Sequence, residues 1–184
     1  MTEPNPKGDE PSDQELIARW RGGDERAAMI LVARHAPALA RFAASSGAGA
    51  EVEELVQDTF VRAFGSLDTF RGDASLRTWL FTIERRLILD RRRAERRRAP
   101  DVELHESHAM TTHDPLDAVV AGESRERLRA AVGRLSPTQR EVFTLRVGEG
   151  LSYREIAEAV GTTEGAARVH YHNAMRTIKE FLHD

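Results

Sequence analysis

Cysteine is absent from this chain of 184 residues, which excludes disulfides, thiolate zinc sites and cysteine nucleophiles. Aromatic residues make up only 6%, and lysine occurs only at positions 7 and 179, so arginine supplies nearly all of the positive charge. There is no signal peptide and no run of about 18 apolar residues, so we expect a cytoplasmic protein without membrane insertion. Neither lysine lies in a phosphate-binding loop, and no nucleophile elbow or zinc-protease motif occurs. We therefore expect no enzyme and no cofactor.

What the chain does have is 40% hydrophobic residues, enough for buried cores, and charge that is segregated along its length. Between residues 85 and 98, eight arginines accompany two acids, whereas residues 101–126 hold seven acids and one arginine. The first 15 residues carry five acids and one lysine. Such blocks favour a nucleic-acid surface flanked by acidic segments that repel DNA or cover that surface. Folding of the acidic segment onto the arginines is a hypothesis from charge alone.

The stretch from Ser136 to the C-terminus has the pattern of a helix-turn-helix. A Ser-Pro pair opens one helix, and the Ser-Tyr-Arg-Glu sequence at 152–155 is a capping box that starts a short second helix over about 153–160. Gly161 supplies a sharp turn, after which a third helix extends to about Leu182. Two short helices, a glycine turn and a longer helix form a unit that reads DNA.

The 3.6-residue period separates two faces of this third helix. Ala167, Tyr171, Ala174 and Ile178 form the stripe that we expect to pack inward. On the other face, arginine and asparagine can make bidentate contacts to base edges, and the remaining cations suit phosphates. The predicted DNA-contacting residues are Arg168, Val169, His170, His172, Asn173 and Arg176. The alternative is a helical bundle with a solvated polar face.

The N-terminal half has the spacing of four helices. We expect the first helix over about 13–20 and the second to begin at Asp24, with Pro37 inside it. The third should begin at Glu51, and the fourth should begin at a cap at Ser75 and continue into the arginine-rich stretch. No strand-like alternation occurs, so the predicted fold is all-α, with two small helical domains joined by a flexible acidic linker. The predicted organisation is a disordered tail at 1–12, domains at 13–98 and 124–184, and a linker at 99–123. His105, His108 and His113 lie in that linker without a rigid frame, so we predict a solvated tether there and no metal site.

Two long motifs carry a family resemblance. Glu-Leu-Val-Gln-Asp-Thr-Phe-Val-Arg-Ala-Phe at 54–64 and Phe-Arg-Gly-Asp-Ala-Ser-Leu-Arg-Thr-Trp-Leu at 70–80 closely resemble the promoter-melting domain of bacterial extracytoplasmic-function sigma factors. Leu-Ser-Pro-Thr-Gln-Arg-Glu-Val-Phe at 135–143 and Gly-Leu-Ser-Tyr-Arg-Glu-Ile-Ala at 150–157 resemble the second domain of that family. The resemblance covers nearly everything except the tail and the linker.

This resemblance implies a dissociable subunit of bacterial RNA polymerase that directs the core enzyme to specific promoters and helps to open the DNA. It implies that the first domain docks on the clamp helices of the largest catalytic subunit and melts the minus-ten element. The second domain would bind the flap of the next subunit and read the minus-thirty-five element as double-stranded DNA. The implied partners are core RNA polymerase, double-stranded and melted promoter DNA, and an anti-sigma factor.

The resemblance also implies site residues. Polymerase binding is expected at Glu54, Leu55, Gln57, Asp58, Val61 and Arg62. Minus-ten recognition and melting are expected at Arg71, Asp73, Ser75, Arg77, Trp79, Arg85, Arg86, Arg92 and Arg93. The run from Arg91 to Arg98 could neutralise several phosphates. Each of these expectations has an alternative. The polymerase-binding residues could form an ordinary solvated helix face, and Phe70 and Trp79 could be core residues. The run from Arg91 to Arg98 could be a frayed, solvated helix end.

Two departures from the family pattern stand out. Glu84-Arg85-Arg86 occupies a place where members often carry an Ala-Arg-Asn type of sequence, and the recognition helix holds fewer fixed cations than is common. The minus-ten preference is therefore open, and His170 and His172 could make upstream binding pH-sensitive. The competing function is a free-standing helix-turn-helix transcriptional regulator whose first domain senses a signal or dimerises. A decoy for an anti-sigma factor is a further alternative.

Overall fold

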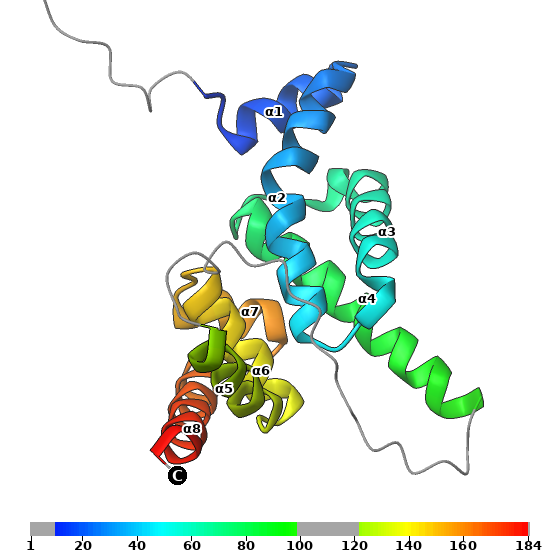
Figure 1. Cartoon of the computed structure of the whole chain (residues 1–184). Coiled ribbons are helices and arrows are strands. Elements are labelled where there is room, and N and C mark those ends of the chain that lie inside the picture. Colours follow the sequence, from blue (N-terminus) through cyan, green and yellow to red (C-terminus); the bar gives the residue numbers. More distant parts are fainter. Residues whose placement is uncertain (1–9, 99–121, 184) are drawn as a thin grey trace, which may run out of the picture. The chain divides into compact units, whose positions relative to one another are not determined.

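The computed structural model describes residues 10–98 and 122–183, with side chains from 126 onward in the second range. All regular structure in these ranges is helical, so the predicted all-α fold is confirmed (Figure 1). Most of the predicted tail and linker, including the three linker histidines, lies outside the described residues. The chain divides into two compact units, one up to Pro37 and the other from Ala38.

The first unit holds helix α1 (Asp13–Arg21) and the start of α2 (Glu25–Ser45), as the spacing predicted. Ser12 caps α1 in a complete capping box with Glu15. Asp13 then ties the two helices together, because its carboxylate accepts hydrogen bonds from Arg34 and His35 at 2.6 and 2.9 Å. Although burial opposes it, these two partners hold the pKa of the Asp13 carboxyl below its ordinary value.

Helix α2 is the one helix in the described ranges with the length and mean hydropathy of a membrane span. This is weak evidence, because the core helix of a soluble protein meets the same criteria. Leu31, Leu39 and Phe42 of α2 are buried within the protein, as expected of a core helix.

In the second unit, α3 (Val52–Gly65) packs on α4 (Leu76–Arg98), and two short 3-10 turns, η1 (Gly49–Glu51) and η2 (Leu67–Thr69), flank α3. The hydroxyl of Ser75 accepts a hydrogen bond from the Thr78 backbone at 3.1 Å, which confirms the predicted cap of α4. Phe42 and Phe81 meet edge to face in the core, with 5.3 Å between ring centroids.

The rest of this unit consists of α5 (Gly122–Gly133), α6 (Pro137–Phe143), the π-turn η4 (Thr144–Gly148), α7 (Tyr153–Val160) and α8 (Glu164–His183). Helix α7 has the predicted bounds and capping box, and hydrogen bonds from Ser152 lower the pKa of the Glu155 carboxyl. Gly161 ends α7 at a φ of 64°, a left-handed conformation that glycine adopts without steric strain.

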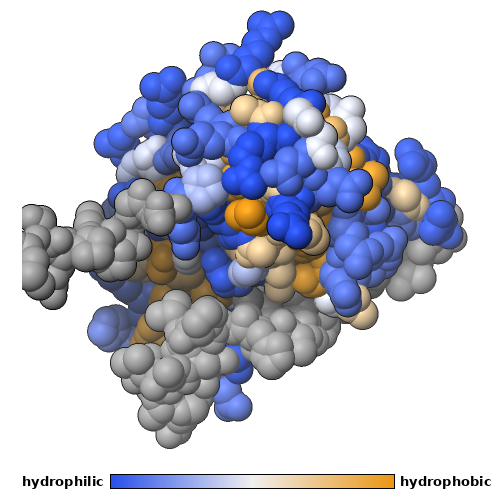
Figure 2. Space-filling view, turned by 90° about the horizontal axis from the view of Figure 1, so that it is seen from above, coloured by the Kyte–Doolittle hydropathy of each residue, from blue (hydrophilic) through white to orange (hydrophobic). Residues whose placement is uncertain are grey.

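The predicted inward stripe of α8 is largely confirmed. Ala167, Ala174 and Ile178 are buried, and Ala174 and Ile178 pack on Ala131 and Val132 of α5 and on Leu135, which follows that helix. Tyr171 is half-buried and lies edge-on to Tyr153, with 5.9 Å between ring centroids. On the face of the molecule seen in Figure 2, hydrophilic side chains predominate and hydrophobic residues appear between them.

From its spacing after Val142 and Phe143, Val147 would be expected to continue the apolar series of α6, but it does not. The backbone changes from α to π geometry at Thr144, which shifts the helical phase, and Val147 is exposed.

Candidate polymerase and promoter interfaces

The outward face of α3 carries most of the residues predicted to bind polymerase. Val61 is 72% exposed, an unusual position for a large aliphatic side chain. Glu54, Gln57 and Arg62 are exposed around it, and Asp58 is half-buried. An apolar anchor within a charged rim is the composition of a protein interface.

Leu55 does not belong to this exposed face, contrary to the prediction from the sequence. It was predicted at the edge of the docking surface, but it is only 1% exposed. Leu55 shares the buried side of α3 with Thr59 and Phe60, one helical turn further on, and therefore belongs to the core.

Arg91 of α4 contacts three acids at one side of this face. Its guanidinium donates to Glu51 at 2.9 Å, to Glu54 at 3.0 Å and to Asp58 at 2.8 Å. Burial works against the charge, yet the hydrogen bonds that Arg91 donates to these acids raise the pKa of its guanidinium. The sequence interpretation placed Arg91 in a run that neutralises phosphates, and the structure instead directs it to α3. Sequence reasoning did not find this contact, because Arg91 lies within a run of similar arginines.

The remaining cations of α4 differ in their surroundings. Arg92 is half-buried and donates to the backbone carbonyl of Ser46, whereas Arg93 is exposed and lies 3.5 Å from Asp90. Arg86 and Arg96–Arg98 are exposed to solvent. Their guanidinium groups can reach a phosphate backbone without first losing a buried partner.

The loop between α3 and α4 presents two aromatic rings near polar side chains. Phe70 and Trp79 lie 5.1 Å apart between ring centroids, and both are half-buried. Each ring therefore packs on the other and keeps an accessible surface. Arg71, Asp73 and Ser75 are exposed beside them.

Two predicted promoter contacts, Arg77 and Arg85, are engaged within the protein. Arg77 donates to the carboxylate of Glu149, and Arg85 donates to the carboxylate of Glu141 at 2.8 Å. Sequence reasoning missed both acids. No local signal marks them, because Glu141 lies between Arg140 and Val142, and Glu149 lies between two glycines.

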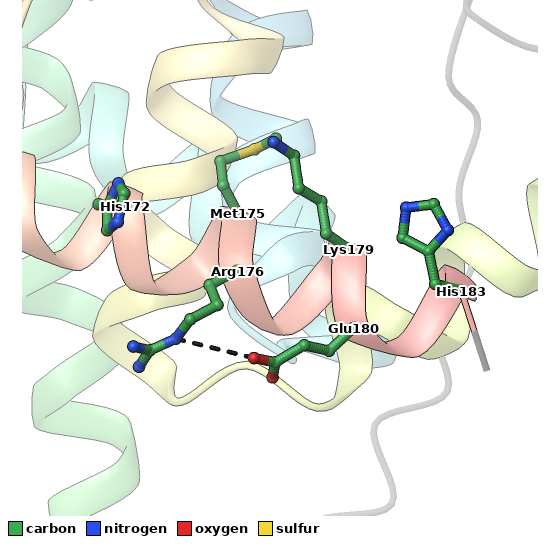
Figure 3. Close-up of a pocket in the computed structure, with 6 residues that line it drawn as sticks. All are labelled: His172, Met175, Arg176, Lys179, Glu180 and His183. Atoms are coloured by element: carbon green, nitrogen blue, oxygen red, sulfur yellow. Dashed lines mark ion pairs between the residues drawn. The ribbon is translucent and has the colours of Figure 1, made fainter.

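The outward face of α8 presents the predicted upstream contacts. Val169 is 58% exposed, Arg168, His172 and Arg176 are exposed, and His170 and Asn173 are half-buried. Arg168 donates to Glu164 at 2.9 Å and lies over the Tyr153 ring. Further along α8, His172, Arg176 and Lys179 line an open hollow together with Met175, Glu180 and His183 (Figure 3).

No group of three or more histidine, aspartate or glutamate side chains within residues 10–98 and 122–183 could hold a metal ion. His105, His108 and His113, which lie in the predicted linker, fall outside the described residues.

Comparison with known proteins assigns the family. Residues 31–98 match the Sigma-70 region 2 family, and residues 125–178 match Sigma-70 region 4. The ECF RNA polymerase sigma-E factor of Escherichia coli K12 is 30% identical over 176 residues, which are 91% of this chain and 92% of that protein. The chain belongs to the ECF RNA polymerase sigma factors. The family consists of non-catalytic initiation factors, and this sigma factor binds core RNA polymerase, directs it to promoters and helps to open the DNA.

Further relatives agree with this assignment. The sigma-E factor of Haemophilus influenzae is 27% identical, with 91% of this chain and 94% of that protein covered. The sigma factor RpoE from Bartonella quintana, in complex with the anti-sigma factor NepR, superposes with a TM-score of 0.71 at 29% identity, over 86% of this chain and 96% of that chain. CnrH in complex with the cytosolic domain of CnrY superposes with a TM-score of 0.66 at 30% identity, over 94% of this chain and 97% of that chain. A free-standing regulator is not favoured.

Proposed function

We propose that this sigma factor docks on the clamp helices of the largest polymerase subunit through the exposed face of α3. The contacting residues are Glu54, Gln57, Asp58, Val61 and Arg62. The exposure of Val61 supports this assignment, because burying an aliphatic side chain of this size against a partner contributes about 1.5 kcal/mol or more. The charged residues around it would set the orientation of docking.

Minus-ten recognition and melting form the second part of the proposal. The loop between α3 and α4 would receive an unpaired base of the melted strand. The residues assigned to this contact are Arg71, Asp73 and Ser75 of the loop and Trp79 of α4. Arg77, Arg85, Arg86, Arg92 and Arg93 would contact the DNA backbone and bases along α4. The support is physical, because unpaired bases bind to accessible aromatic rings with nearby cations.

Upstream recognition is assigned to α8. Arg168, Val169, His170, His172, Asn173 and Arg176 would enter the major groove of the minus-thirty-five element. An exposed valine suits the methyl group of thymine, and arginine and asparagine suit guanine and adenine edges. Capping by Thr163, whose hydroxyl accepts a hydrogen bond from Ala166 at 3.1 Å, holds the start of this helix in place.

The organisation proposed for the chain is a tail at 1–12, a melting domain at 13–98, a linker at 99–123 and a helix-turn-helix domain at 124–184. Phosphodiester synthesis belongs to the polymerase, so we assign no enzymatic activity to this chain, and we place the protein in the cytoplasm. An anti-sigma factor is a proposed partner, because both aligned structures are complexes with a partner chain, NepR and CnrY respectively.

The observation that carries this proposal is the outward face of each of two helices, α3 with its exposed Val61 and α8 with its exposed Val169. The test is transcription by purified core polymerase on promoters selected from a random DNA library by the reconstituted holoenzyme. We expect specific start sites only when the chain is added. Identical start sites with and without the chain would refute the proposal.

A further inference from the structure

Tyr153, the first residue of α7, lies at the centre of a cluster of side chains from three helical elements. The guanidinium carbon of Arg168 on α8 lies 5.0 Å from the centre of the Tyr153 ring, and that of Arg146 on η4 lies 4.8 Å from the same point. Tyr171 of α8 packs against this ring at a steep angle. The face of an aromatic ring attracts both cations and the edges of other rings, so the cluster joins η4, α7 and α8 through one side chain.

Two contacts restrict Arg168, which the sequence pattern assigns to the upstream element. Its guanidinium lies over the Tyr153 ring and also donates a hydrogen bond to Glu164, one helical turn earlier, at 2.9 Å. The Arg168 side chain nonetheless stays 63% exposed. An exposed arginine ordinarily samples many rotamers, and ordering it against a ligand costs binding free energy. Arg168 is therefore already ordered in the free chain while its side chain remains accessible.

The Tyr153 ring has supports of its own that do not depend on Arg168. Arg146 is half-buried and donates a hydrogen bond to the backbone carbonyl of Leu151 at 2.7 Å, which fixes one cation against the ring from within the protein. Tyr171 provides a second support, and the capping box of Ser152 fixes the backbone at the start of α7. The ring consequently orients Arg168, and its own position does not rely on that arginine.

We propose that Tyr153 is a positioning residue for upstream recognition, because its ring presents the Arg168 guanidinium in one orientation and thereby sets how sharply one base pair is discriminated. The inference rests on the proposed function, which places Arg168 in the major groove. A bidentate contact to a guanine edge requires the planar guanidinium to approach in a fixed direction. An unrestricted arginine also reaches nearby phosphates, which adds affinity without sequence discrimination.

The contact is tested first in the full chain, without DNA or polymerase. NMR should show Arg168 side-chain protons shifted upfield by the ring current of Tyr153, and Arg168→Lys, which removes these signals, assigns them. Tyr153→Phe keeps the ring and should keep the shift, whereas Tyr153→Leu should abolish it at unchanged circular dichroism. Arg134, whose guanidinium carbon lies 4.7 Å from the centre of the Phe181 ring, is the internal reference and should keep its own shift in both variants.

The positioning role is tested by binding of the holoenzyme to a selected promoter and to single base-pair variants of its minus-thirty-five element. Arg168→Ala should lower discrimination at one base pair by about tenfold. Tyr153→Leu should lower discrimination at the same base pair by about threefold, the value of an exposed cation–ring contact, and should have no further effect in the Arg168→Ala background. Tyr153→Phe should discriminate as the wild type does.

A variant with unchanged shape separates the cation–ring attraction from packing. A trifluorinated phenylalanine at position 153 has nearly the shape of phenylalanine but attracts cations only weakly, so it should lose discrimination as Tyr153→Leu does. Phe181→Leu is the matched control, because it removes another arginine–ring contact of α8 and should leave discrimination unchanged.

Three results would overturn the inference. The absence of a ring-current shift at Arg168 in the wild-type chain would overturn the contact. An equal loss of affinity for every base-pair variant in Tyr153→Leu, or wild-type discrimination with the trifluorinated ring, would overturn the positioning role while Arg168 still reads the promoter. Wild-type discrimination by Arg168→Ala at every base pair is a separate outcome, which would refute the role of Arg168 in the proposed function and, with it, that of Tyr153.

Discussion

Arg91 on α4 joins Asp58 on α3, with 2.8 Å between Nη2 and Oδ2, and the same guanidinium also holds Glu51 and Glu54. Two of these acids belong to the proposed polymerase surface. Arg91 therefore holds two acids of that surface in place, whereas Arg93 and Arg96–Arg98 of the same helix are exposed to solvent.

Replacing this arginine should affect docking more than folding. For Arg91→Met we expect a several-fold loss of affinity for core polymerase, because Glu54 and Asp58 lose their common partner. The free energy of unfolding should change by only about 1 kcal/mol, since the acids are partly exposed and solvent screens the pairs. Titration of labelled chain with core polymerase measures the first effect and urea unfolding the second. Arg93→Met is the control, and equal losses in both variants would contradict the positioning role.

Val61 offers a direct test of the docking face. Val61→Asp places a charge where we expect an apolar contact, so the affinity for core polymerase should fall by tenfold or more. Because the side chain is exposed, the stability of the isolated chain should stay within about 0.5 kcal/mol of wild type. Val169→Asp on α8 is the matched control and should retain core binding. Unchanged core binding by the Val61 variant would remove this face from the proposal.

Glu84 is a buried acid in a stripe with Leu80, Leu87 and Arg91 on α4, at spacings of three and four residues. Neither carboxyl oxygen has a hydrogen-bond partner among the described residues, and burial raises the pKa of this carboxyl well above its ordinary value. Glu84→Met should therefore raise the free energy of unfolding at pH 7 by about 1–3 kcal/mol, because a side chain of similar length removes the desolvation penalty.

The pH dependence of the Glu84→Met variant follows from the raised pKa of the Glu84 carboxyl. The folded state binds a proton more tightly than the unfolded state, so the wild-type free energy of unfolding falls as the pH rises above about 4.5. The advantage of Glu84→Met should thus grow from low pH towards neutral pH, as urea unfolding at pH 5 and pH 8 would measure. Glu95→Met, at an exposed acid of the same helix, should show no such trend. Parallel stability curves for wild type and Glu84→Met would disprove the buried-acid account.

Arg168 is the test of upstream recognition. Arg168→Ala should weaken binding of the holoenzyme to the minus-thirty-five element by about tenfold, the loss expected for one bidentate base contact. Quantitative footprinting on a selected promoter measures this change. Arg134→Ala removes an equal charge just after α5, where the guanidinium lies over the Phe181 ring, and should leave the footprint unchanged. If the two variants behave alike, Arg168 does not read the promoter.

Gly161 tests the local turn. Its φ of 64° is strained for any residue with a Cβ, so Gly161→Ala should lower the free energy of unfolding by about 1–2 kcal/mol. Gly165→Ala, within α8, is the control and should be neutral or stabilising because alanine favours the helix. Thermal unfolding of both variants would show the difference, and equal melting temperatures would argue against backbone strain at the turn.

The sequence by itself determined the features that depend on near neighbours. The capping box at Ser152 and Glu155 and the glycine at 161 predicted the bounds of α7, because both act within one helical turn. The same local reasoning found the buried stripe of α8. It missed α5, whose short sequence has little amphipathic pattern, and the π-turn after α6, which shifts the helical phase by one residue.

Only the tertiary structure decided which charges meet. Arg77, Arg85 and Arg91 look alike in the sequence, as cations on one arginine-rich helix. Packing of α4 on α3 and α7 gives each a different carboxylate. An ion pair depends on the position of a few atoms at the ends of long side chains, and that position is set by helices distant in sequence. Residue type and spacing therefore predicted which helices carry the arginines, while three-dimensional packing determined which carboxylate each arginine contacts.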